Sequence, residues 1–337
     1  MASATSIEPD ASVPTPAGAP VGARAAIGGD GSADAPHQRQ TIATLREQQE
    51  VDGVFACTRK ERQISRAGTP YLNVELSDST GSILARAFRD ADVLAGRFER
   101  GELVRVHGRV ERFRDALQIA AQSIARADGE QADPANFLPT AYRDLDELDG
   151  FLEHLAREVY DRDLKLLLDG LLGDVRLRAE LRRAPCSIPS PQHSSHHAYL
   201  GGLLEHTVAV ASMALELCTL HARLDRDLLL SAAIVHDIGK TREFTYGAEI
   251  ARSAEGRMLG HIELGLREIA TKLPRSMPSE RRLALEHCVL MHHGAESGAG
   301  ARFASAEALA LYRLNALDAA VKGAFEHGLG ASQAAQL

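Results

Sequence analysis

Hydrophobic residues change their spacing part-way along the chain, and this change limits the fold more than any other feature. From Thr41 to Arg126 they alternate with polar residues in short runs separated by turn residues, which is typical of β-strands. From about residue 146 they recur at helical intervals instead. The sequence therefore predicts a multidomain protein in which an all-β domain, residues 41–126, precedes an all-α domain, residues 146–330.

The all-β segment has the length and strand content of a small barrel. About five alternating runs fit into some 85 residues, and the OB-fold is the commonest five-stranded barrel. In the run that holds Val104, Val106 and Val110, the valines are expected to point inward. The predicted strands cover residues 51–60, 69–78, 82–90, 102–113 and 116–124.

Charge limits how this protein could bind a nucleic acid. The net charge of −8 excludes a globally basic binder, so any such binding needs a local patch. Residues 41–126 hold 14 basic and 12 acidic side chains, which makes this segment slightly positive. Basic grooves with interleaved aromatic rings hold single strands on OB barrels, and a solvated strand face with core aromatics is an equally weighted alternative. The candidate contacts are Arg105, His107 and Arg109 on one strand face, with Tyr71, Phe88 and Phe113 as stacking rings.

Two further segments are predicted to carry no chemistry. Residues 1–40 contain ten Ala, five Gly, five Pro and no aromatic residue, too little apolar surface to offset the entropy of ordering. We expect a disordered tail there. Residues 127–145, with Pro134 and Pro139, are expected to form a linker.

Cysteine spacing and hydropathy indicate a cytoplasmic location. The four cysteines stand alone, with no C-x-x-C pair, which argues against both a thiolate zinc module and a disulfide scaffold. The sequence contains no run of about 18 apolar residues, so we expect neither a membrane span nor a membrane partner. The amino terminus lacks the basic and apolar pattern of a signal segment.

A histidine and an aspartate stand side by side at the end of a very apolar helix. Residues 227–240 read DLLLSAAIVHDIGK, so His236 and Asp237 are expected to be buried. Burial of an imidazole and a carboxylate is costly unless they are paired or bind a metal. Asp318 lies in a second apolar stripe, formed by Leu311, Leu314, Val321 and Phe325, where an acid also needs a cation.

Other histidines gather in the same part of the sequence. Ten of the 14 histidines lie between His193 and His293. Separate predicted helices contribute His206, His261 and the pair His292 and His293. Imidazole and carboxylate ligands without thiolates suit manganese, iron, magnesium or zinc, and the ligand types alone do not choose among them.

The order of these residues resembles the HD-domain metal-dependent phosphohydrolases. The matching pattern is His206, then the block HDIGK, then Asp318. The resemblance implies that His206, His236, Asp237 and Asp318 bind a first ion. It also implies that His261, His292 and His293 bind a second ion, bridged to the first by Asp237.

A closer resemblance covers both halves of the chain, from about residue 45 to 328. The block HHAYLGGLLEHT at residues 196–207, the sequence GHI at Gly260, the sequence HHG at Gly294 and G-x-P-Y-L at residues 68–72 are similar to the bacterial OB-fold plus HD-domain 3′-to-5′ exoribonucleases of the YhaM type. This implies a metal-dependent exonuclease that releases nucleoside monophosphates from single-stranded RNA or DNA, with RNA the leading substrate. It allows a homo-oligomer.

The resemblance also implies a mechanism with roles for three further side chains. Two divalent ions, with manganese favoured, would activate a water and clamp the scissile phosphate. Lys240 would neutralise phosphate charge, although a helix-end cation would explain it too. His196 and His197 would contact phosphate or act as general acid, and a polar helix start is an equal alternative.

Two other functions remain open at this point. One is an HD phosphohydrolase of free nucleotides or of a cyclic dinucleotide. The sequence after His293 is GAESGAG rather than Gly-Tyr-Pro, which argues against the cyclic-dinucleotide form, and a barrel would be idle in a free-nucleotide enzyme. The other is a binding module without activity, which the presence of all seven predicted ligands disfavours.

Overall fold

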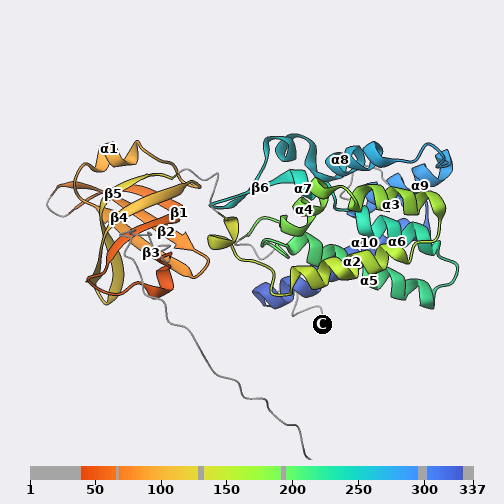
Figure 1. The fold of residues 1–337 in the computed structure, drawn as a ribbon, viewed down its shortest axis with the longest axis horizontal. Coiled ribbons are helices and arrows are strands. Elements are labelled where there is room, and N and C mark those ends of the chain that lie inside the picture. Colours follow the sequence, from red (N-terminus) through yellow and green to blue (C-terminus); the bar gives the residue numbers. More distant parts are fainter. Residues whose placement is uncertain (1–38, 66–67, 128–132, 191–194, 295–301, 329–337) are drawn as a thin grey trace, which may run out of the picture. The chain divides into compact units, whose positions relative to one another are not determined.

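The computed structural model describes residues 39–65, 68–127, 133–190, 195–294 and 302–328 (Figure 1). Met1–Arg39 and Gln40–Leu337 form separate units. The predicted tail at residues 1–40 lies almost wholly outside the described residues, so its expected disorder stays a prediction.

The all-β part is a closed five-stranded barrel with strand order β1-β2-β3-β5-β4, as the OB-fold prediction requires. β4 pairs antiparallel with both β1 and β5, while β3 and β5 run parallel. Val104, Val106 and Val110 are fully buried, as the alternation predicted. The elements are η1 Ile42–Thr44, β1 Glu50–Ile64, β2 Pro70–Asp78, β3 Gly81–Ala87, α1 Ala91–Ala95, β4 Leu103–Phe113 and β5 Ala116–Arg126.

The short helix α1 was not expected from the sequence. It has only five residues, too few for a periodic signal, and its N-cap Asp90 makes no side-chain cap bond. Ala91 and Leu94 are buried against the barrel core, so packing rather than propensity stabilises it.

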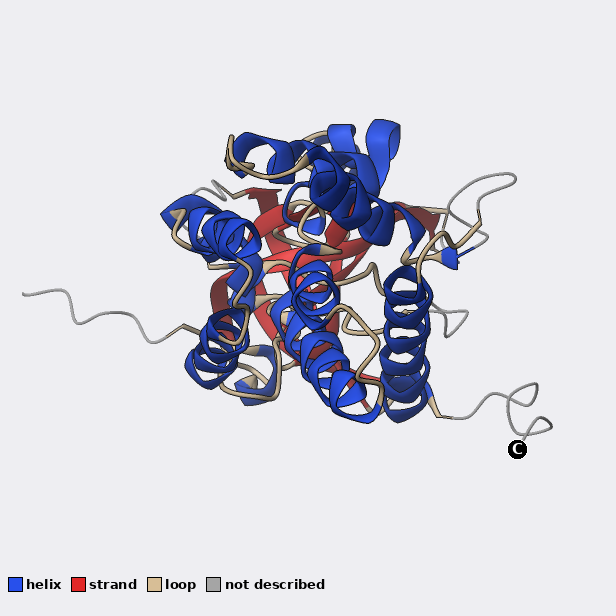
Figure 2. Cartoon of the chain, turned by 90° about the vertical axis from the view of Figure 1, so that its right-hand side faces the viewer, coloured by secondary structure: helices blue, strands red, loops and turns tan. Residues whose placement is uncertain are grey.

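The second part of the chain is helical, as predicted, and helices dominate it in Figure 2. Aspartates cap several of the helices, among them Asp144, Asp161 and Asp174, each accepting two backbone N–H groups of the first turn. The helices are α2 Leu145–Arg157, α3 Arg162–Leu172, α4 Val175–Arg183, α5 Gly202–Leu220, α6 Arg226–Val235, α7 Lys240–Glu243, α8 Ala254–Lys272, α9 Ser279–Met291 and α10 Ala306–His327, with η3 Pro134–Asn136 before them.

A small hairpin interrupts the helices and corrects the all-α expectation in detail. β6 Phe244–Tyr246 pairs antiparallel with β7 Ile250–Arg252. Aromatic and β-branched residues flank the turn at Gly247, and this local β preference outweighs helical periodicity over so short a segment.

Helices α5 and α6 form the centre of the helical core. Every residue of α6 from Leu228 to Val235 is buried. Of the described helices, α5 is the one long and apolar enough to cross a membrane, and 56% of its apolar window is buried inside the protein. Its hydrophobicity is accounted for by its place in the core.

The apolar stripe expected around Asp318 is only partly buried. Leu311 and Leu314 lie in the core, but Val321 is 46% and Phe325 83% exposed. Periodicity identifies a helix face but not how far the neighbouring helices extend along it. The last turns of α10 therefore carry apolar residues that the core does not cover.

Candidate functional site

Turns at helix ends bring the predicted ligands together. His206 lies within α5, whereas His236 and Asp237 follow the last residue of α6. Gly260 adopts φ 70° and ψ 165° inside α8, and the kink restarts the helix at His261. A Cβ on Gly239 would lie 2.0 Å from the carbonyl oxygen of His261, so only glycine allows this close approach.

One carboxylate oxygen of Asp237 faces a first group of side chains. Its Oδ2 lies 3.5 Å from Nε2 of His206 and 3.4 Å from Nε2 of His236. The Nζ of Lys240 lies 2.7 Å from the same oxygen. These three residues and the aspartate are buried, and the two imidazoles and the carboxylate form one group able to hold an ion.

The other oxygen of Asp237 faces a second group. Its Oδ1 lies 3.5 Å from Nε2 of His261 and 3.4 Å from Nε2 of His292, while Nε2 of His293 lies 3.0 Å from that of His261. This oxygen is buried without a hydrogen-bond partner. A buried anionic oxygen left unpaired among imidazole nitrogens fits a divalent cation, so the residues present suit two ions bridged by one carboxylate.

Burial leaves the imidazoles neutral, the form that binds metal. It lowers the pKa of His206 and His292 to about 4 and that of His293 to about 3. Burial acts to raise the pKa of Asp237, but Lys240 and His236 hold it well below its usual range. At neutral pH the site therefore holds the ionised carboxylate of Asp237 between neutral imidazoles, the protonation states that bind divalent cations.

Backbone carbonyls and one carboxylate orient the histidine rings. Nδ1 of His236 donates to the carbonyl of Ala233 at 2.9 Å, and Nδ1 of His261 lies 3.2 Å from Oε2 of Glu243. Bonds of this kind leave Nε2 free to bind metal. Glu243 is 2% exposed and was missed by the sequence reasoning, although it follows Lys240 by only three residues.

Asp318 lies beside the two groups of predicted ligands, and its side chain contacts two histidines. Its Oδ2 accepts from Nδ1 of His206 at 2.6 Å and from Nε2 of His197 at 2.9 Å. Both contacts use the same carboxylate oxygen. The ligand role of Asp318 stays a prediction, and in this structure the residue orients His206.

His197 and His196 occupy a loop rather than the polar helix start that was the alternative. His197 is 2% exposed with φ 50°, and both ring nitrogens contact protein groups. His196 is half-buried, 3.9 Å from Sγ of Cys186. Cys186, which the sequence did not single out, lies 3.3 Å from Nζ of Lys240 and belongs to the wall of the centre.

On the barrel, the basic strand face is matched by acids. Arg105 pairs with Asp52 at 2.9 Å, His107 lies 3.3 Å from the same carboxylate, and Arg109 pairs with Glu50 at 2.7 Å. These partners come from β1: Glu50 lies opposite Arg109 and Asp52 opposite His107 in the β1–β4 register, whereas Arg105 reaches Asp52 diagonally. The net positive charge expected of this face is therefore largely cancelled.

The predicted stacking rings Tyr71, Phe88 and Phe113 lie at the barrel surface rather than in its core. Tyr71 and Phe88 stack with centroids 5.1 Å apart, and Phe88 is 51% exposed. The guanidinium of Arg86 lies 4.9 Å from the centroid of Phe113, which is 44% exposed. A groove of about 720 Å³, lined in part by Arg86, Phe88 and Arg89, runs beside these rings. We call Tyr71, Arg86, Phe88 and Phe113 the aromatic platform.

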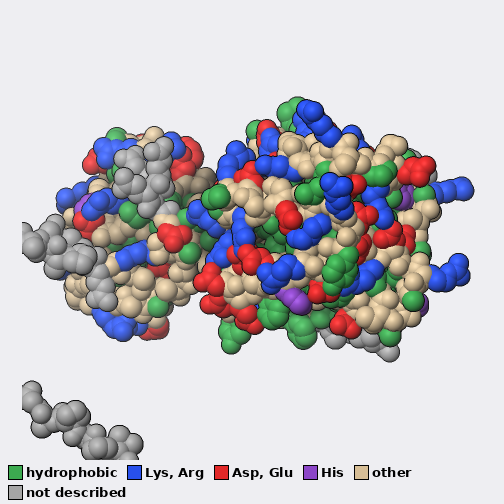
Figure 3. All heavy atoms as spheres, turned by 45° about the vertical axis from the view of Figure 1, so that its right-hand side comes forward, with side chains coloured by type: hydrophobic (Ala, Val, Ile, Leu, Met, Phe, Trp, Pro, Cys, Tyr) green, Lys and Arg blue, Asp and Glu red, His purple; other side chains and the backbone are tan. Residues whose placement is uncertain are grey.

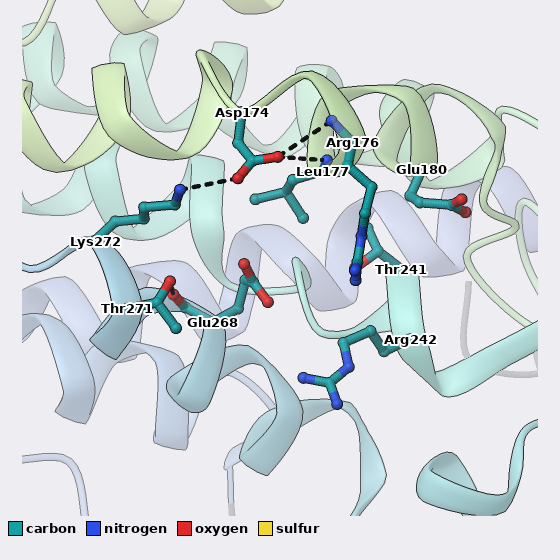
Figure 4. Close-up of a pocket in the computed structure, with 9 residues that line it drawn as sticks. All are labelled: Asp174, Arg176, Leu177, Glu180, Thr241, Arg242, Glu268, Thr271 and Lys272. Carbon is teal, nitrogen blue, oxygen red and sulfur yellow. Dashed lines mark hydrogen bonds and ion pairs between the residues drawn. The ribbon is translucent and has the colours of Figure 1, made fainter.

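A separate cavity of about 250 Å³ lies between α4, α7 and α8 (Figure 4). There Asp174 bonds Lys272 and the backbone N–H groups of Arg176 and Leu177, so its carboxylate is already satisfied. None of the predicted metal ligands lines this cavity. Figure 3 shows basic and acidic side chains interspersed over the visible face of the helical part.

The buried histidines predict an acid-sensitive metal-free protein. In the unfolded chain they titrate near pH ~6.5, so the unfolded state binds more protons below that pH and stability falls toward about pH 4. Urea unfolding of metal-free protein at several pH values measures the loss. A midpoint unchanged between about pH 7 and 5 would contradict it.

Comparison with known proteins identifies both parts. Residues 203–320 match the HD domain, and residues 57–126 match the OB-fold nucleic acid binding domain. The 3′-5′ exoribonuclease YhaM of Bacillus velezensis is 27% identical over 274 residues, 80% of this chain and 85% of that protein. The 3′-5′ exoribonuclease YhaM of Shouchella clausii is 29% identical over 279 residues, 80% of this chain and 84% of that protein. In a solved structure, the second OB-fold domain of replication protein A from Methanococcus maripaludis is 19% identical, with a TM-score of 0.23, and covers 27% of this chain and 96% of that one.

Proposed function

We propose that this HD-domain chain, which resembles the YhaM-type exoribonucleases over four-fifths of its length, is a metal-dependent 3′-to-5′ exonuclease of single-stranded RNA or DNA, with RNA the leading substrate. It releases nucleoside monophosphates. The observation that carries the proposal is Asp237, whose two carboxylate oxygens face two separate groups of histidines. That arrangement suits phosphodiester hydrolysis at a pair of divalent ions.

Each ion has its own set of protein ligands. Bound divalent ions would supply an activated water and clamp the scissile phosphate. We propose manganese, and iron, magnesium or zinc are the alternatives that these ligand types leave open. Asp237 would belong to both sets, because its two oxygens face different histidines. The proposed first set is His206, His236 and Asp237, to which the family resemblance adds Asp318, and the proposed second set is Asp237, His261, His292 and His293.

Lys240 and His197 complete the site in different ways. Lys240 is buried against Asp237, and its charge offsets that of the phosphate as negative charge develops on it. His197 is held between protein groups on both sides, so its contribution is to the arrangement of Asp318 rather than to free proton transfer.

We assign binding of the single-stranded substrate to the barrel. Bases of a single strand would stack on the aromatic platform while Arg86 and Arg89 contact backbone phosphates. The paired side chains Arg105, His107 and Arg109 remain proposed phosphate contacts, each in competition with its acidic partner. The four buried free cysteines support a reducing, cytoplasmic location, and homo-oligomer formation is proposed from family resemblance alone.

The platform can be tested by truncating one exposed ring. Phe88→Ala is expected to raise KM for a long single-stranded RNA by roughly 5- to 150-fold while kcat stays unchanged, because a stacked base contributes ~1–3 kcal/mol. Phe325→Ala, which removes an 83% exposed ring of α10, is the matched control and should leave KM unchanged. Equal KM for Phe88→Ala and wild type would remove the ring from the binding surface.

The function itself is tested by chelation and by substrate choice. EDTA should abolish RNA hydrolysis, and manganese should restore it better than magnesium, because magnesium prefers oxygen ligands and suits an imidazole-rich site less well. Full activity in excess chelator would contradict the metal mechanism. Faster turnover of free nucleotides or of a cyclic dinucleotide than of RNA would favour the alternative phosphohydrolase.

A further inference from the structure

We propose that Tyr199 and Glu205 are positioning residues for His206 and act on it through His197 and Asp318. The proposal rests on the proposed function, in which His206 is a ligand of the first ion. It assigns a role to a hydrogen-bonded chain that leads from His206 to the last turns of α10.

The chemistry of each group fixes the direction of every hydrogen bond in this chain. The hydroxyl of Tyr199 has one proton and donates it to Oε2 of Glu205 at 2.6 Å. It must therefore accept from Nδ1 of His197, 2.9 Å away. The carboxylate of Asp318 only accepts, so Nε2 of His197 and Nδ1 of His206 both donate to its Oδ2, at 2.9 Å and 2.6 Å.

The consequence for His206 is a fixed tautomer. With its proton on Nδ1, the lone pair of Nε2 points toward His236 and Asp237, which lie 3.2 Å and 3.5 Å away. A ligand ring held in this way loses little freedom when it binds an ion, and partners of this kind commonly change metal affinity when they are removed.

The far end of the chain is anchored to α10, the helix that carries Asp318. Nζ of Lys322 lies 3.2 Å from Oε1 of Glu205, and the backbone N–H of His197 donates to Oε1 of Glu326 at 3.1 Å. A Cβ on Gly202 would lie 2.2 Å from the carbonyl oxygen of His197, so the loop and the start of α5 are in close contact.

Loss of the tyrosine hydroxyl would loosen this arrangement at one defined point. Nδ1 of His197 would then have only Glu205, at 3.5 Å, as an acceptor nearby. The ring would move toward that carboxylate and away from Asp318, which would leave Nδ1 of His206 less firmly held.

The test compares two tyrosines in the same kind of contact. Tyr246 also donates to a glutamate, Glu180, at 2.6 Å, but lies outside the chain that reaches His206. Manganese is titrated calorimetrically into metal-free wild type, Tyr199→Phe and Tyr246→Phe, and kcat and KM are measured on single-stranded RNA.

Tyr199→Phe should weaken manganese binding by ~10-fold or more, with unchanged KM for RNA and activity recovered at high manganese. Tyr246→Phe should bind manganese as the wild type does, and Glu205→Gln should weaken binding in the same direction as Tyr199→Phe.

The outcomes separate this inference from the proposed function. Wild-type manganese affinity in Tyr199→Phe, or equal weakening in Tyr246→Phe, would overturn the inference alone. Absence of manganese binding in the wild-type protein would overturn the proposed function and this inference together.

Discussion

Asp237→Asn is expected to lower the rate of RNA hydrolysis by on the order of 10³-fold or more, because one neutral amide replaces the anion shared by both ions. No other described side chain faces both groups of histidines through two different oxygens. Metal analysis of the variant should show both ions lost together. Loss of one ion only would mean that Asp237 does not bridge.

A control is needed because Asp237 also neutralises a buried lysine. Without the carboxylate, Lys240 loses its partner at 2.7 Å, and a buried charge left unpaired costs about 3–5 kcal/mol. The double variant Asp237→Asn/Lys240→Met removes both charges and should regain much of the thermal stability lost by the single variant. It should stay inactive, which separates the joint chemical role of Asp237 and Lys240 from folding.

Asp318→Asn is expected to reduce kcat/KM by about 10- to 100-fold and to weaken binding of the first ion. An amide offers one accepting oxygen and no charge to His197 and His206, which both donate to the present carboxylate. Burial acts to lower the pKa of His197, but hydrogen bonds to Asp318 and Glu205 raise it above its usual value. The variant should therefore also melt at a lower temperature, since His197 loses a charged hydrogen-bond acceptor.

The matched control for Asp318→Asn is Asp169→Asn, which removes the exposed ion-pair partner of Lys165 on α3. An exposed pair of this kind contributes ~0–1 kcal/mol, so activity and metal content should be unchanged. Wild-type turnover and metal content in Asp318→Asn would remove Asp318 from the site.

Much of the metal centre could be predicted from the sequence because burial and metal chemistry both select the same few residue types. A histidine and an aspartate at the end of a helix as apolar as α6 need a partner, and the structure brings His206, His261 and His292 to them. The resemblance to known motifs supplied their order. Tyr199 and Glu205 lie within the recognised block, yet nothing in the sequence says which of their atoms meet.

The other features of the site depend on contacts between residues far apart in the sequence, which only the folded structure provides. Cys186 precedes Lys240 by 54 positions, and no periodicity links the two. Arg109 looked free for phosphate until the strand register placed Glu50 opposite it. In the same way, the stripe on α10 continued in the sequence to Phe325, beyond the point where other helices cover it.

The most direct test of the central claim is degradation of one single-stranded RNA labelled separately at its 3′ and 5′ ends, with manganese and either wild type or Asp237→Asn. We expect the wild type to release the 3′ label at once as a mononucleotide and to shorten the 5′-labelled strand progressively. Asp237→Asn should leave both strands intact. Release of the 5′ label first, internal cleavage, or equal degradation by Asp237→Asn would contradict a 3′-to-5′ exonuclease built on this metal centre.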